Sequence, residues 1–249
     1  MRVTGSRSIR TGWIRGGVLV AVTAMLAACG VKVGAGNIST GVPLAEFDLD
    51  GTPPTGVALA GADTVLVTTG ATFSVRAEGP ATATERLRFN RTGDTLAIGR
   101  EGDGPRGGPA AIVRVTLPNI RSLALSGSGD LSSDALSGEA ELRLSGSGNL
   151  SAPQVTASRL KVALAGSGDI AAGGTAETLE LGIAGSGSAN MARLQVGAAE
   201  VRVSGSGDAA FASNGKVSGA IAGSGDVQVR GTAQCDVRRA GSGNLTCTP

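Results

Sequence analysis

From residue 122 onward, apolar and polar positions alternate along the chain, and the alternation recurs at a nearly fixed interval. Gly-Ser-Gly occurs seven times, with 18 to 20 residues between successive first glycines, and aliphatic residues stand two and four positions before most copies. Alternation with period two is typical of strands that bury one face, whereas a helix needs apolar residues three and four positions apart. The first glycines are Gly127, Gly146, Gly166, Gly185, Gly205, Gly223 and Gly241.

This repeat predicts an all-β fold, a parallel β-helix or solenoid with about 18–20 residues in each coil. Equivalent residues of successive coils would stack about 4.8 Å apart, so that the inward positions form aliphatic ladders. Glycine is expected at each corner because it accepts positive φ and lets successive corners stack without a clash between Cβ atoms. The second glycines of these corners are Gly129, Gly148, Gly168, Gly187, Gly207, Gly225 and Gly243.

Residues 46–121 lack the repeat but contain short alternating runs that predict strands, such as 64–67 and 112–117. Thr92-Gly93-Asp94, between two of these runs, has the composition of a hairpin turn. We expect this portion to be a β-rich N-terminal cap that continues into the repeat β-helix of residues 122–249. A separate β-sandwich domain is the alternative.

The first 28 residues have the layout of a secretory signal. Residues 1–15 carry four arginines and no acid, and the apolar run that follows is too short for a comfortable transmembrane helix. It ends in Leu26-Ala27-Ala28-Cys29, which resembles the bacterial lipobox and implies cleavage before Cys29 and lipidation of its thiol. An ordinary signal peptide with an incidental cysteine is the alternative. Gly30 favours the outer membrane over the inner one, and residues 29–45 predict a flexible tether.

Charge and composition exclude several classes of function. The 22 Lys and Arg residues balance 20 Asp and Glu, and removal of residues 1–28 takes away four arginines and no acid, so 18 − 20 leaves a net charge of −2. Nucleic-acid binding therefore loses its electrostatic basis. The absence of histidine excludes Ser-His-Asp and Cys-His nucleophiles. We expect no cofactor.

The residue after each Gly-Ser-Gly is an acid, an amide or serine. Carboxylates are ligands of hard cations, so a metal ladder is one interpretation. However, only Asp208 and Asp226 are acids in adjacent coils, stacked carboxylates repel one another, and Asp and Asn stabilise turns. We therefore expect structural corners. The positions are Asp130, Asn149, Asp169, Ser188, Asp208, Asp226 and Asn244.

Two further groups of side chains are candidate sites. Paired carboxylates hydrolyse glycosidic bonds, but Glu141, Glu180 and Glu200 occupy outward positions close to arginines, which favours a solvated face of ion pairs. Cys235 and Cys247 lie 12 residues apart in an exported chain, which favours a disulfide over two free thiols. The bond would pin the last coil, where Arg239 replaces an inward aliphatic residue and the core is expected to end.

The sequence also resembles a known family. The resemblance is carried by LPNI at 117–120, LALSGSGDL at 123–131 and the recurring Ser-Gly-Ser-Gly-Asp/Asn, and it covers about residues 46–249. This pattern is similar to the head GIN domain of putative auto-transporter adhesins, a domain of unknown function in bacterial envelope lipoproteins. The resemblance implies a right-handed β-helix and a secreted, anchored location, and it transfers no catalytic residue.

These observations favour a non-catalytic, lipid-anchored envelope protein that acts as an adhesin-like interaction module. Its expected partners are the membrane, through the lipid anchor, and a surface protein or glycan. A periplasm-facing structural or accessory lipoprotein that binds peptidoglycan or another envelope protein is the first alternative. A glycan-active β-helix enzyme is the second.

Overall fold

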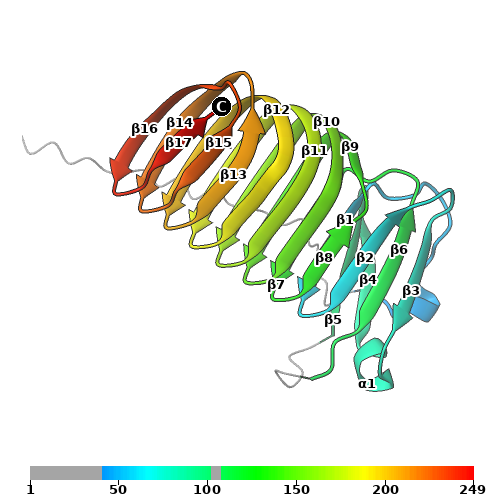
Figure 1. The fold of residues 1–249 in the computed structure, drawn as a ribbon. Helices are drawn as coiled ribbons and strands as arrows, with labels where there is room; N and C mark the ends of the chain where they lie inside the picture. The colour runs from blue at the N-terminus through cyan, green and yellow to red at the C-terminus, as the bar shows by residue number, and fades with distance from the viewer. Residues whose placement is uncertain (1–40, 102–107) are drawn as a thin grey trace, which may run out of the picture. The chain divides into compact units, whose positions relative to one another are not determined.

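The computed structural model describes residues 41–101 and 108–249, which form a β-solenoid of about seven turns (Figure 1). The predicted fold class is confirmed. Helical segments are short, namely the 3₁₀ turn η2 (Leu44–Glu46) and α1 (Ala81–Thr84). Within these ranges, no helix has the length and apolar character needed to cross a membrane.

The strands account for most of the described chain. They are β1 (Gly56–Gly61), β2 (Thr64–Thr69), β3 (Ser74–Glu78), β4 (Leu87–Thr92), β5 (Thr95–Arg100), β6 (Ile112–Leu117), β7 (Ser122–Gly127), β8 (Asp130–Ser133), β9 (Leu136–Gly146), β10 (Asn149–Gly166), β11 (Asp169–Gly185), β12 (Ser188–Gly205), β13 (Asp208–Ser213), β14 (Lys216–Gly223), β15 (Val227–Arg230), β16 (Gln234–Gly241) and β17 (Leu245–Thr248).

The strands of the coils lie on up to three sides of the solenoid, and all three sides are present in the coils of β9 to β12. On the first side, before the Gly-Ser-Gly corner, the strands stack in the order β5, β1, β7, β9, β10, β11, β12, β14, β16. On the second side, after the corner, the order is β6, β2, β8, β10, β11, β12, β13, β15, β17. The third side is formed by the middle of the long strands, where residues 155–157 of β10 pair with residues 174–176 of β11. All these pairings are parallel.

One coil is inserted out of chain order. Strands β1 and β2 lie between the pair β5–β6 and the pair β7–β8, and Gly61 is in register with Gly127. Gly61-Ala62-Asp63 therefore takes the place of a Gly-Ser-Gly corner, which is why the motif alone does not reveal this coil. The N-terminal portion shares one sheet and one hydrophobic core with the repeats.

Antiparallel strands lie at the N-terminal end of the stack. β4 and β5 form the hairpin predicted at Thr92-Gly93-Asp94, and β3 pairs with β6. Val42 adds a single antiparallel bridge to Phe89 on β4, and the ring of Phe47 packs 5.9 Å from that of Phe89. The antiparallel pairing ends the parallel stack and covers the core at this end.

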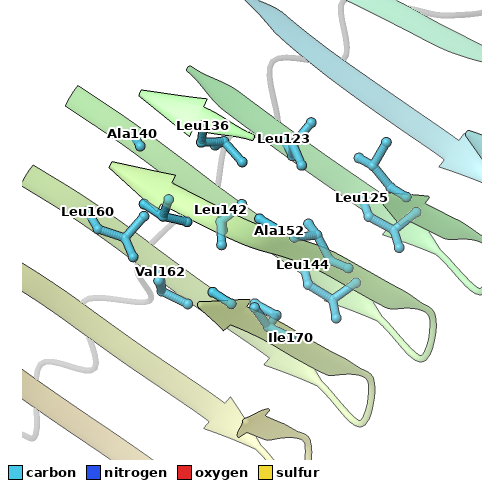
Figure 2. Packing of buried hydrophobic residues seen from close by; sticks show 14 of the residues in the cluster. Leu123, Leu125, Leu136, Ala140, Leu142, Leu144, Ala152, Leu160, Val162 and Ile170 are labelled. Atoms are coloured by element: carbon cyan, nitrogen blue, oxygen red, sulfur yellow. The ribbon is translucent and has the colours of Figure 1, made fainter. Parts of the chain in front are cut away.

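Aliphatic ladders fill the interior of the solenoid. Leu123 is in register with Leu142 and Leu125 with Leu144, and all four side chains are fully buried (Figure 2). Val162 continues the first of these ladders on β10. Each such side chain is stabilised by about 1.5–3 kcal/mol relative to an exposed one. Because the neighbouring coil covers each apolar row, no coil can bury its own core alone.

The corners stack so closely that only glycine fits. The first glycines of the seven corners have φ between 119° and 133°. A Cβ on any of them would lie 2.1–2.4 Å from the carbonyl oxygen of the corner residue one coil earlier. That oxygen is also in use, since Gly146 O accepts hydrogen bonds from Ser167 N and Gly168 N at 2.9 and 3.0 Å. The corner is therefore a continuous ladder of backbone hydrogen bonds.

Gly185→Ala tests this stacking. The new Cβ would meet Gly166 O at 2.2 Å at a φ of 130°, so we expect the free energy of unfolding to fall by about 2–5 kcal/mol. Gly182→Ala on the same strand is the matched control, because a Cβ there meets no atom within 4 Å, and it should change stability by less than about 0.5 kcal/mol. Urea denaturation measures the stability of both variants. Equal losses of stability would show that close stacking of the corners is not the reason for the glycine.

A buried ion pair holds the first corner to the coil beneath it. The Asp63 side chain is fully buried and accepts hydrogen bonds from Arg100 Nε at 2.8 Å, Arg100 Nη2 at 2.5 Å and Ala111 N at 2.7 Å. Arg100 Nη2 also donates to Pro109 O at 2.8 Å. The hydrogen bond to Asp63 raises the pKa of Arg100 above its ordinary value, so the guanidinium stays charged.

Asp63→Ala should therefore lower the free energy of unfolding by about 3–5 kcal/mol, because it leaves Arg100 without its buried carboxylate. Glu78→Ala breaks the pair with Arg114, whose two side chains are about half exposed, and should cost less than about 1 kcal/mol. Thermal and urea unfolding compare the two variants. If Asp63→Ala lowers the free energy of unfolding no more than Glu78→Ala does, the buried pair does not stabilise the corner.

The last coil, β16 and β17, is held by the predicted disulfide. Cys235 and Cys247 are bonded, with their Cα atoms 6.8 Å apart. Arg239 is in register with the buried Ile221 of β14 but is itself exposed, so the aliphatic ladder stops one coil earlier. A charged side chain at an inward position also disfavours pairing of this edge with another chain.

Removal of the disulfide should loosen this coil alone. A cross-link that closes a loop of this length stabilises by about 3 kcal/mol, so Cys235→Ser with Cys247→Ser should accelerate amide hydrogen exchange in β16 and β17. The amides of β10 to β12 serve as the internal control and should keep their protection. Unchanged exchange in β16 and β17 would mean that strand pairing suffices to hold the last coil.

Candidate binding groove

A groove of about 530 Å³ lies on the third side of the solenoid and crosses β10, β11 and β12. Asn214, in the turn between β13 and β14, completes its lining. The groove is separate from the Gly-Ser-Gly corners, which lie between the first and second sides. Its lining residues are Thr156, Ala157, Ser158, Thr175, Ala176, Glu177, Gln195, Val196, Gly197 and Asn214.

Coil length explains where the groove forms. Between the first glycines from 146 to 205 the coils have 20, 19 and 20 residues, whereas the next two have 18. Irregularities in strand register accommodate the extra residues at the edge of the third side, for example between Met191 and Gln195 on β12. In the following coil the third side contracts to the turn at Ser213, Asn214 and Gly215, which closes one end of the groove.

The lining forms three rows with one residue from each coil. The middle row consists of small or β-branched residues whose side chains belong to the hydrophobic core, and the rows on either side are exposed. Strand register places the members of the first two rows beside one another on β10, β11 and β12, and the members of the third row follow the middle row directly in each strand. The rows are Thr156, Thr175 and Gln195; Ala157, Ala176 and Val196; and Ser158, Glu177 and Gly197.

The polar side chains of the groove are available to a ligand. Within the described ranges, Thr156, Thr175, Gln195 and Glu177 form no side-chain hydrogen bond with the protein, and all four are exposed. The backbone that carries them is fixed by parallel pairing on both sides of β11. Hydroxyl and amide groups are therefore presented from a rigid surface, which limits the entropy lost on binding.

Glu177 is the only charged residue among the ten that line the groove. Arg159 and Arg193 are exposed on the neighbouring stretches of β10 and β12 but do not line it. The groove itself therefore combines uncharged hydrogen-bonding groups with a single carboxylate.

The residues that follow the corners lie in a separate exposed row. Asn149 Nδ2 donates to Asp130 Oδ1 at 2.8 Å, and Asp226 N and Asn244 N donate to the Oδ1 atoms of Asp208 and Asp226 at 2.8 and 2.9 Å. These side chains therefore join adjacent coils. Asp169 is exposed in the same row. In the part of the chain that the structure describes, no group of three or more His, Cys, Asp or Glu residues is placed to hold a metal ion.

The glutamates considered from the sequence occupy the first side and pair with cations. Glu141 forms an ion pair with Arg143 at 2.5 Å, Glu180 with Lys161 at 3.9 Å, and Glu200 with Arg202. They lie on a different side from the groove. The structure thus does not bring them together with its polar rows.

Cys29, the predicted signal of residues 1–28 and most of the predicted tether lie outside the described residues. Lipidation of Cys29 therefore stays a prediction.

Sequence reasoning missed the groove. The available signal was the change in coil length after Gly205, together with Thr156 and Thr175 at the same place in consecutive repeats. These threonines have no unusual neighbours in sequence, and the groove becomes visible only when the coils are stacked.

A family model described as "Putative auto-transporter adhesin, head GIN domain" matches residues 53–233. The chain belongs to this family. The match includes the inserted coil and every strand that lines the groove. No curated protein matches the chain.

Three solved structures share the fold of this head GIN domain protein. A putative adhesin from Bacteroides fragilis is 19% identical, with a TM-score of 0.74, over 79% of this chain and 93% of that one. A putative adhesin from Parabacteroides distasonis is 15% identical, with a TM-score of 0.64, over 80% and 93%. A putative lipid binding protein from the same species is 18% identical, with a TM-score of 0.62, over 79% and 93%. At these identities the likeness concerns the fold alone.

Proposed function

We propose that this head GIN domain protein is a non-catalytic, adhesin-like interaction module of the bacterial envelope and that the groove is its binding surface. The observation that carries the proposal is the groove, with its exposed hydroxyl, amide and carboxylate groups on three stacked coils. Membership of a family described as adhesins supports the same class of function.

The chemistry of the lining supports binding rather than catalysis. Glycoside hydrolysis usually requires two carboxyl groups on opposite sides of the scissile bond, and Glu177 is the only one among the ten lining residues. Glu141, Glu180 and Glu200 are held in ion pairs on another side. The groove offers several hydrogen-bonding groups in rows along the solenoid axis, which suit recognition of an extended ligand.

Anchoring through Cys29 fits this role. In the proposed arrangement the lipid on Cys29 holds the chain to the outer membrane, since each buried methylene contributes about 0.8 kcal/mol and several acyl chains give a stable anchor. Residues 29–45 then connect the lipid to the solenoid, whose side carries the groove. A protein that faces the periplasm and binds peptidoglycan or another envelope protein is the other outcome of the experiment below.

The orientation is tested with an epitope tag after Pro249. Antibody should label intact cells as strongly as permeabilised cells, because the proposal places the solenoid outside. Cys29→Ala is the control, and it should release the tagged protein from the membrane fraction. Labelling only after permeabilisation would overturn the surface location and favour the periplasmic alternative.

A further inference from the structure

We propose that the groove binds a neutral glycan strand that lies along the solenoid axis, across the β-strands. The inference deepens the proposed function and rests on it, since it names the class of ligand for the same groove. It depends on the geometry of the three rows, on their chemistry and on their charge.

The geometry of the rows favours a linear ligand. Each row supplies one residue per coil, and neighbouring strands lie about 4.8 Å apart. Thr156, Thr175 and Gln195 therefore present hydrogen-bonding groups at this interval along the axis, over a length of about 10 Å. A compact small molecule would contact one or two coils, whereas a chain with a short repeating unit contacts all three.

The chemistry of the rows suits sugar rings. The side chains of Ala157, Ala176 and Val196 are only 7%, 5% and 2% exposed because they point into the core, and the outward polar rows stand on both sides of them. A pyranose ring has an apolar face of C–H groups and a rim of hydroxyls. The ring can lie between the two outward polar rows, over the strand backbone, while its hydroxyls exchange hydrogen bonds with Thr156, Thr175 and Gln195.

An extended peptide fits the groove less well. A peptide that adds to a sheet uses the free backbone groups of an edge strand. The backbone of β11 is paired with β10 on one side and with β12 on the other, along the same residues that form the groove. A peptide would find only side chains here, and its own backbone N–H and C=O groups would lose water without regular partners.

The charge of the lining selects against anionic polymers. Glu177 lies in the central coil, and no lysine or arginine is among the lining residues. A phosphate, sulfate or uronate group in the groove would face this carboxylate, whereas Arg159 and Arg193 stand outside the lining. A neutral glycan meets no such repulsion and can donate a hydroxyl hydrogen bond to Glu177.

The test measures binding of defined oligosaccharides to the full-length protein purified in detergent. Isothermal titration calorimetry compares cellohexaose, chitohexaose and xylohexaose with the acidic hexagalacturonate. At least one neutral hexasaccharide should bind, and hexagalacturonate should bind at least tenfold more weakly. Binding of none of the neutral probes, or preference for the acidic one, would overturn the proposal.

Two variants locate the site. Thr156→Val with Thr175→Val removes two hydroxyls at nearly constant volume and should weaken binding of the neutral probe at least fivefold, whereas Thr246→Val on β17, also exposed, should leave it unchanged. Glu177→Gln should reduce the ratio between the affinity for the neutral probe and the affinity for hexagalacturonate. Equal affinity in the double variant and the wild type would overturn the proposal.

A negative result in these binding measurements would refute the glycan ligand but not the surface location of the protein. Antibody labelling of intact cells tests that location separately, because it does not depend on the ligand.

Discussion

The contact between a glycine corner and the carbonyl oxygen of the corner one coil earlier is the constraint on which the rest of this solenoid depends. There is no room for a Cβ at these corners, and the same oxygens accept backbone hydrogen bonds from the next coil. This contact fixes the register of every coil, and register in turn decides which side chains enter the aliphatic ladders. The inserted coil makes the same contact, since Gly61 stacks against Gly127.

Because the corners keep their register, differences in coil length are accommodated on the third side. Extra residues in the coils between residues 146 and 205 enter as irregularities in register on β10 to β12, and the shorter coil that follows closes the groove at Asn214. The glycine corners therefore provide stability and the third side provides the variable surface. The buried pair of Asp63 and Arg100 and the disulfide of Cys235 and Cys247 secure the two ends.

The repeated part of the fold could be predicted because Leu, Val or Ile recurs at fixed distances from Gly-Ser-Gly. This recurrence indicates which positions of each coil are buried. The coil of β1 and β2 could not be placed, since its corner is Gly61-Ala62-Asp63 and its neighbours in the sheet are distant in sequence. The disulfide followed from the spacing of two cysteines in an exported chain. The groove escaped prediction because Thr156, Thr175 and Gln195 are ordinary surface residues until stacking places them in one row.

The most direct test of the central claim, that the third side carries the binding surface, is a crystal structure of the protein with the neutral hexasaccharide that binds most tightly. We expect a glycan strand across β10, β11 and β12 that contacts Thr156, Thr175 and Gln195 and stops at Asn214. A ligand found along the serines of the Gly-Ser-Gly corners, on the ion pairs of the first side or at the last coil would contradict it.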